Sequence, residues 1–124
     1  TYRRALSHLE KDRVVIVGGG IGRPFLTTDT AALNLAQEMN CDVVIKTTKV
    51  DGVYDKDPTK HSDAVKYDSL SYQEALASPT INIMDNAAIG VAMDEHKPVI
   101  ICDLLTDGNI KRAASGEAVG TLIS

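Results

Sequence analysis

Two apolar segments of this sequence run directly into polar or glycine-rich turns, and this pattern constrains the fold most. The segment 13–17 leads into three successive glycines, and the segment 42–46 leads into a turn rich in lysine, threonine and aspartate. In α/β proteins, such turns follow parallel strands at the edge of the sheet where ligands bind. We therefore expect a mostly parallel sheet covered by helices on both faces, with two ligands bound side by side.

Periodicity and capping signals place the other elements. We expect strands at 13–17, 42–46, 98–102 and 120–123, helices at 2–10, 29–39 and 107–115, and two short helices capped by Ser71 and Asp85. Thr27 or Thr28 is the expected cap of helix 29–39, and Ser71 with Glu74 matches a capping box. Residues 51–66 show no sustained period, so we expect a long surface loop there.

Composition excludes several classes of protein. The length of 124 residues corresponds to about one domain, and no apolar run approaches the roughly 20 residues needed to cross a membrane. A net charge of -4 argues against a general nucleic-acid or anionic-membrane surface, so the expected partners are small molecules or other protein chains. A cytoplasmic location is the default expectation. Three isolated histidines offer no metal spacing, and we assign no metal site to protein side chains.

The glycine-rich turn differs from two common phosphate-binding motifs. No Gly-Lys-Ser/Thr follows the glycines, as a P-loop requires, and Arg23 stands where a Rossmann turn needs its third glycine. Glycines still allow close approach of a ligand to the backbone, and Thr27 and Thr28 place hydroxyls beside the free amides of a helix N-terminus. The turn therefore favours an anion such as a phosphate. A plain strand-to-helix turn with a threonine cap is the alternative reading.

Three sequence motifs, in order along the chain, resemble those of the bacterial uridylate kinases, which belong to the amino acid kinase family. They are Gly19–Ala32 (GGIGRPFLTTDTAA), Lys46–Pro58 (KTTKVDGVYDKDP) and Ile83–Asp85 (IMD). The resemblance implies a three-layer α/β/α fold with a mostly parallel sheet, the amino acid kinase (carbamate kinase-like) fold. It also implies that residues 1–124 form the C-terminal, ATP-binding part of a single domain. The family's earlier part, with its Lys-x-Ser-Gly phosphate-binding turn, is expected to be missing.

The resemblance assigns roles to individual residues. The UMP-binding residues that it implies are Ile21, Gly22, Arg23, Pro24, Phe25, Leu26, Thr27 and Thr28, with the Phe25 ring as a wall of the pocket. The implied ATP-binding residues are Thr48, Tyr54 and Asp57. Arg23 occupies a place where the family often has asparagine. Tyr54 is expected to pack on the adenine or ribose.

Asp29 is the expected catalytic residue. A carboxylate among phosphate-binding groups repels the substrate unless a cation lies between them, so we expect a cationic neighbour. In related kinases the matching aspartate organises lysines that neutralise the transferred phosphoryl group. Lys46 and Lys49 are candidates for part of that charge. The alternative is that Asp29 only complements the dipole at a helix N-terminus.

The implied reaction is transfer of the γ-phosphoryl group of ATP to UMP, giving UDP, with Mg²⁺ as the bridging ion. Full-length members of the family form homohexamers. Two alternatives stay open: another amino acid kinase, such as aspartate kinase, glutamate 5-kinase or carbamate kinase, or a catalytically silent nucleotide-binding module. We expect the 124-residue chain alone to be inactive, because part of the phosphate-binding machinery is missing.

Overall fold

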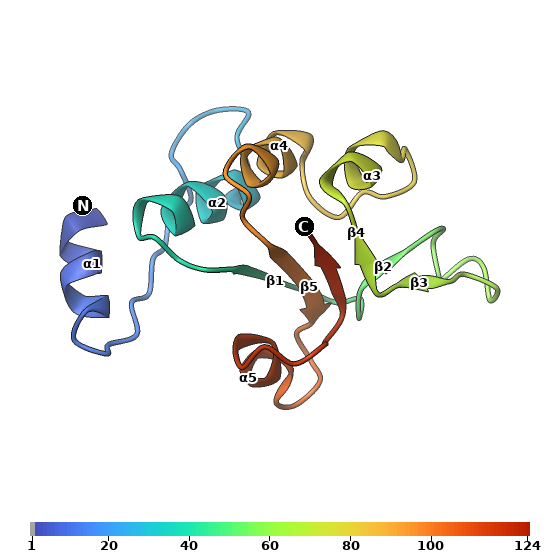
Figure 1. Ribbon diagram of the computed structural model, residues 1–124. Coiled ribbons are helices and arrows are strands. Elements are labelled where there is room, and N and C mark those ends of the chain that lie inside the picture. Colours follow the sequence, from blue (N-terminus) through green and yellow to red (C-terminus); the bar gives the residue numbers. More distant parts are fainter. Residues whose placement is uncertain (1) are drawn as a thin grey trace.

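The computed structural model describes residues 2–124 and shows a four-stranded sheet with helices on both faces and a separate two-stranded hairpin (Figure 1). Its elements are α1 (Tyr2–Leu9), α2 (Thr28–Glu38), β1 (Val44–Thr48), β2 (Val53–Tyr54), β3 (Lys66–Tyr67), β4 (Ser69–Leu70), α3 (Tyr72–Ala77), α4 (Asn86–Asp94), β5 (Val99–Asp103), α5 (Asn109–Ala114) and β6 (Thr121–Ile123). Among the helices of these residues, none combines the length and apolar character needed to cross a membrane.

The main sheet has the strand order β1-β5-β6-β4. β1 pairs with β5 and β4 pairs with β6 in parallel, whereas β5 and β6 are antiparallel. Helices α2, α3 and α4 lie on one side of this sheet and α5 lies on the other (Figure 1). The predicted three-layer α/β/α arrangement with a mostly parallel sheet is therefore confirmed.

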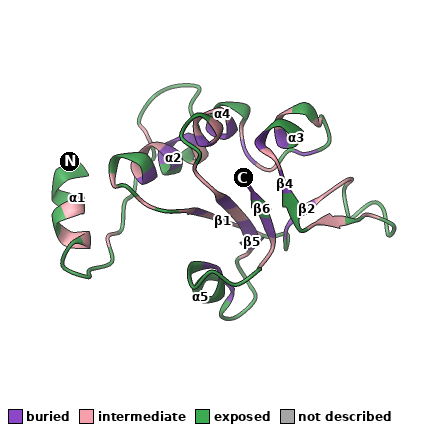
Figure 2. Ribbon diagram, in the orientation of Figure 1, coloured by how far each residue is buried: buried purple, intermediate pink, exposed green. Residues whose placement is uncertain are grey.

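The core lies between β5, β6 and the helices α2 and α4. Its largest fully buried apolar side chains are Leu33, Ile89, Val99, Ile101 and Ile123. Figure 2 shows the same distribution, with buried positions along the central strands and on the inner sides of α2 and α4. The central sheet and these two helices thus enclose the core, and the loops around the candidate site extend from them.

Three predicted helix caps are confirmed. The Thr27 side chain accepts the backbone N–H of Asp29 at the start of α2, and Asp85 caps α4. Ser71 and Glu74 form the complete capping box of α3, with each side chain accepting from the other residue's backbone N–H. These caps fix where α2 and α4 begin, and both helix starts lie beside the candidate site described below.

The predicted strand at 13–17 does not form. These residues have no regular secondary structure, and the Val14 and Ile16 side chains are 93% and 94% exposed. A strand is stable only beside another strand that satisfies its backbone hydrogen bonds. No strand within residues 2–124 pairs with this segment. The preceding helix α1 forms as predicted, but none of its residues is buried (Figure 2).

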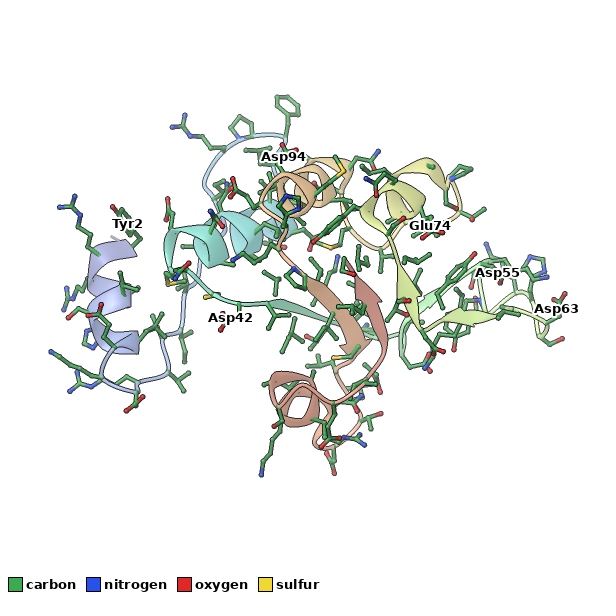
Figure 3. All side chains as sticks on the ribbon, viewed as in Figure 1. Tyr2, Asp42, Asp55, Asp63, Glu74 and Asp94 are labelled. Carbon is green, nitrogen blue, oxygen red and sulfur yellow. The ribbon has the colours of Figure 1, made fainter. Side chains whose placement is uncertain are left out.

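The expectation of an irregular loop over residues 51–66 is partly wrong. Strands β2 and β3 pair within and just beyond this segment, leaving residues 55–65 as the loop of a hairpin. Asp55 closes the loop, because its backbone N–H donates to the Val65 carbonyl at 3.0 Å and its carboxylate accepts the Val65 N–H at 2.8 Å. Figure 3 shows Asp55 and Asp63 on this loop, at the edge of the molecule. Two-residue strands are too short to give a detectable period.

Candidate active site

Asp29 and Lys46 form an ion pair where α2 begins beside β1. The Lys46 Nζ atom lies 2.8 Å from Asp29 Oδ2 and also donates to the carbonyl oxygen of Ile83. Both side chains are largely shielded, with exposed fractions of 24% for Lys46 and 19% for Asp29. The predicted cationic neighbour of Asp29 is therefore Lys46, whereas the other candidate, Lys49, is exposed.

Asp85 holds the start of α2 against the start of α4. Its carboxylate accepts hydrogen bonds from the Thr27 hydroxyl, from the Thr30 hydroxyl at 3.3 and 3.4 Å, and from the Ala88 backbone N–H at 2.6 Å. Burial alone would raise the pKa of Asp85, but these three donors and the charge of Lys46 outweigh it and hold the pKa below its ordinary value. Asp85 therefore stays ionised and links the predicted acceptor loop to α4.

The sequence predicted only the capping role of Asp85. Its further contacts to Thr27 and Thr30 span 58 and 55 residues of chain, so no local pattern reveals them. The one available signal was the position of Asp85 in the third motif of the resemblance.

A cavity of about 590 Å³ opens beside Lys46, at the carboxyl end of β1. Its lining comes from residues 46–48, from much of 50–58, and from 80–83. The volume lies in the range of pockets that bind small molecules. All three predicted ATP-binding residues, Thr48, Tyr54 and Asp57, line this cavity. The contribution of residues 80–83 was not predicted.

Two of these lining residues have shifted pKa values. The Tyr54 hydroxyl donates to Asp51 Oδ1 at 2.8 Å, and this bond, together with burial and the Asp51 charge, raises the pKa of Tyr54. Asp57 accepts the Thr59 hydroxyl at 2.6 Å and the Thr59 N–H at 2.9 Å. These bonds, with the nearby Lys60 charge, lower the pKa of Asp57. Tyr54 is thus neutral and Asp57 ionised at neutral pH.

Of the predicted acceptor residues, 21–27 form the irregular loop that leads into α2, and Thr28 is the first residue of that helix. Ile21 is half-buried and residues 22–28 are exposed. Gly22 and Phe25 both have left-handed backbone conformations, with φ of 66° and 65°. The Phe25 ring is fully exposed, at 102%, so its role as a pocket wall stays a prediction. Of these residues, only Thr27 at the end of the loop and Thr28 at the start of α2 lie next to the Asp29–Lys46 pair.

Known proteins share this fold. Residues 2–103 match the amino acid kinase family. The chain is 38% identical to a UMP kinase from Bacillus anthracis, with a TM-score of 0.94, and covers 51% of that structure. It is 25% identical to a UMP kinase from Ureaplasma parvum, with a TM-score of 0.89, and covers 53% of that structure. It is 38% identical to a uridylate kinase from Archaeoglobus fulgidus, with a TM-score of 0.79, and covers 58% of that structure. In each case the whole of this chain is covered, so it spans about half the length of these proteins. The chain belongs to the amino acid kinase family.

Proposed function

We propose that the full-length protein is a UMP kinase, which transfers the γ-phosphoryl group of ATP to UMP. The observation that carries the proposal is the position of the Asp29–Lys46 pair. Lys46 lines the cavity that holds the predicted ATP-binding residues, and Asp29 follows the acceptor residues Thr27 and Thr28. Phosphoryl transfer requires positive charge between the donor and the acceptor, and Lys46 lies between the donor pocket and the acceptor loop. Similarity to structures described as UMP kinases supports the choice of acceptor.

In this proposal each group has a distinct task. The free backbone amides at the start of α2, with the Thr28 hydroxyl beside them, bind the phosphate of UMP. The cavity binds ATP, with the Tyr54 ring against the adenine or ribose. Asp29 holds Lys46 Nζ in place between the two substrates, and Lys46 stabilises the charge on the transferred group. The chain would thus form the C-terminal, ATP-binding part of one kinase domain.

Mg²⁺ enters the proposed reaction as part of the substrate MgATP. Within residues 2–124, no group of three or more His, Cys, Asp or Glu side chains could hold a metal ion. Mg²⁺ is usually bound through phosphate oxygens, waters and one or two carboxylates rather than by an all-protein site. When bound, the ion neutralises charge on the phosphates. We further propose that the protein is a cytoplasmic homo-oligomer, which light scattering on the purified full-length protein and fractionation of the cells that produce it would test.

Two other functions are the alternatives. The first is a different amino acid kinase, acting on aspartate, glutamate or carbamate, and the second is a nucleotide-binding module without catalytic activity. A screen of the full-length protein with MgATP and UMP, aspartate, glutamate or carbamate separates them. We expect UMP to be the only one of these four acceptors that is phosphorylated, giving UDP. Phosphorylation of another acceptor, or MgATP binding without turnover, would replace the proposal by one of the alternatives.

A matched pair of variants tests the acceptor site. Thr28→Ala in the full-length protein should cost about 1.5 to 3 kcal/mol in UMP binding, because it removes a donor to a charged phosphate. Ser115→Ala is the control, because the Ser115 hydroxyl donates to a backbone carbonyl within α5, on the other face of the sheet. An unchanged KM for UMP in Thr28→Ala would remove Thr28 from the site. The 124-residue chain alone should show little or no turnover.

A further inference from the structure

The hairpin β2–β3 is joined to the main sheet through the side chain of Thr121. This residue begins β6 and is fully buried, with 0% exposure. Its hydroxyl oxygen accepts the backbone N–H of Val53 in β2 at 2.9 Å and donates to the backbone carbonyl of Tyr67 in β3 at 2.5 Å. One hydroxyl group thus contacts both strands of the hairpin, although the hairpin and β6 belong to different sheets.

The two backbone groups that Thr121 joins face each other across the hairpin. Val53 and Tyr67 are paired residues in the antiparallel register of β2 and β3. The hydroxyl bridges the N–H of one to the C=O of the other. Next to it, the Leu122 N–H donates to the Asp68 carbonyl at 3.0 Å, which continues the contact between the end of the hairpin and β6. A buried N–H or C=O without a partner is costly, so the hydroxyl has a defined structural task.

Gly52 shows how tightly the hairpin fits against Thr121. A Cβ atom at position 52 would lie 2.7 Å from Thr121 Oγ1 and 3.0 Å from the Lys66 side chain. No residue with a side chain fits there while the hydroxyl keeps its place. Gly52 and Val53 line the cavity of about 590 Å³, and Tyr54 follows them on the same wall. The Thr121 hydroxyl therefore lies directly behind the wall of the proposed ATP site.

We propose that Thr121 is a positioning residue for the donor nucleotide. Its hydroxyl fixes the hairpin against β6 and so sets where Tyr54 and Asp57 stand relative to Lys46. Thr121 touches no substrate itself, since it is fully buried. Loss of the hydroxyl should weaken binding of MgATP. Binding of UMP should be unaffected, because the proposed UMP site is held by Asp85 and α2. The identity of the ligand rests on the proposed function, whereas the anchoring of the hairpin does not.

Amide hydrogen exchange on the full-length protein without nucleotides tests the anchor. The Val50 N–H is the internal reference, because it also donates to a threonine hydroxyl at 2.9 Å, but to that of Thr48 in an exposed turn. We expect the Val53 amide to exchange at least about tenfold more slowly than the Val50 amide. In Thr121→Val, the exchange rates of the Val53 amide and of the other hairpin amides should rise by a similar factor, while the exchange rates of the α2 amides stay unchanged. Equal exchange at Val53 and Val50, or no effect of Thr121→Val, would overturn the inference.

Steady-state kinetics of the same variants test the consequence for the donor site. Thr121→Val should raise the KM for MgATP about fivefold or more and change the KM for UMP less than about twofold. Thr121→Ser keeps the hydroxyl and should restore the KM for MgATP. An equal rise in both constants, or a Ser variant as impaired as the Val variant, would show a general structural role instead. If Thr121→Val does not fold, Thr121→Cys replaces it, since a thiol is a weaker donor and acceptor.

The two experiments separate failure of the inference from failure of the proposed function. If the unaltered protein forms no UDP from UMP, the proposed function fails, but the exchange rates of Val53 and Val50 still decide whether Thr121 anchors the hairpin. In that case calorimetric titration with MgATP replaces the kinetics. Weaker MgATP binding in Thr121→Val than in Thr121→Ser would support the positioning role, and equal binding would contradict it.

Discussion

Asp85→Ala tests how the start of α2 is held at the site. The substitution removes the cap of α4 and the common acceptor of the Thr27 and Thr30 hydroxyls. Loss of a helix cap costs about 1 kcal/mol. Thr30 is buried, and leaving its hydroxyl without a partner costs about 1 to 3 kcal/mol more. Thr27 is exposed and can bond to water, so it adds little. The expected loss of unfolding free energy is therefore about 2 to 4 kcal/mol.

Two further variants serve as controls for this loss of unfolding free energy. Asp85→Asn keeps a carbonyl oxygen that can accept the Ala88 N–H and a hydroxyl, so it should cost only about 1 kcal/mol through the lost charge. Ser71→Ala removes the capping box of α3, away from the ion pair, and should also cost about 1 kcal/mol. Asp85→Ala should in addition raise the KM for UMP, because Thr27 loses its anchor, whereas Ser71→Ala should leave that constant unchanged.

Urea unfolding of the full-length variants, followed by circular dichroism, measures the free energies, and the UDP-forming assay measures the KM values. Two results would refute the reasoning. One is an Asp85→Ala protein no less stable than Ser71→Ala, because the Thr30 contact would then contribute nothing. The other is an Asp85→Asn protein as unstable as Asp85→Ala, because the shape of the acceptor would then be irrelevant.

Other perturbations have separable outcomes. Lys46→Met should lower kcat/KM about tenfold or more, since it removes a charge-assisted contact, and an unchanged value in the UDP assay would exclude Lys46 from the site. Tyr54→Phe keeps the ring and should leave the KM for MgATP within about twofold, whereas Tyr54→Ala should raise it about fivefold; similar values for both would argue against ring packing. Gly120→Ala would place a Cβ 1.9 Å from a β5 carbonyl oxygen at a positive φ, so it should cost more than about 4 kcal/mol in urea unfolding. Gly116→Ala has positive φ without a close contact and should cost about 1 kcal/mol; equal costs would contradict the clash. Because the folded-state pKa of Asp85 is lowered, its charge stabilises the fold above the unfolded-state pKa of about 4 and ceases to do so as the pH falls through the folded-state value. The stability difference between Asp85 and Asp85→Asn should shrink in that acid range, and a difference independent of pH would contradict the assignment.

Local signals made the helices predictable from the sequence. The caps at Thr27, Ser71 and Asp85 involve hydrogen bonds over two or three residues, so the pattern of side chains is enough to place them. Strand formation is different, because it depends on a partner elsewhere in the chain. The segment 13–17 has the composition of a strand but no partner strand within residues 2–124, and it has no regular secondary structure.

At the hairpin, by contrast, two strands form that the sequence did not predict. Strands β2 and β3 have only two residues each, so the Val and Tyr residues that favour a strand there are too few to show a strand period beside the polar loop. Thr121, far along the chain, places a buried hydroxyl between Val53 and Tyr67 and hydrogen-bonds to both strands. The contact that joins the hairpin to β6 thus comes from a residue distant in the sequence, and no local pattern reveals it.

The Asp29–Lys46 pair combines both kinds of information. The sequence indicated that a carboxylate beside an anion site needs a cation, and it offered Lys46 and Lys49 without a choice between them. The choice of Lys46 follows from the face of β1 on which its side chain lies. Side chains alternate between the faces of a strand, and the Lys46 side chain extends to Asp29 at the start of α2 and to the Ile83 carbonyl before α4. Lys49 lies beyond the end of β1, where no strand geometry directs its side chain to that face. A lysine held by a carboxylate and a carbonyl has little rotational freedom left, and this preorganised charge is what transfer of a phosphoryl group requires.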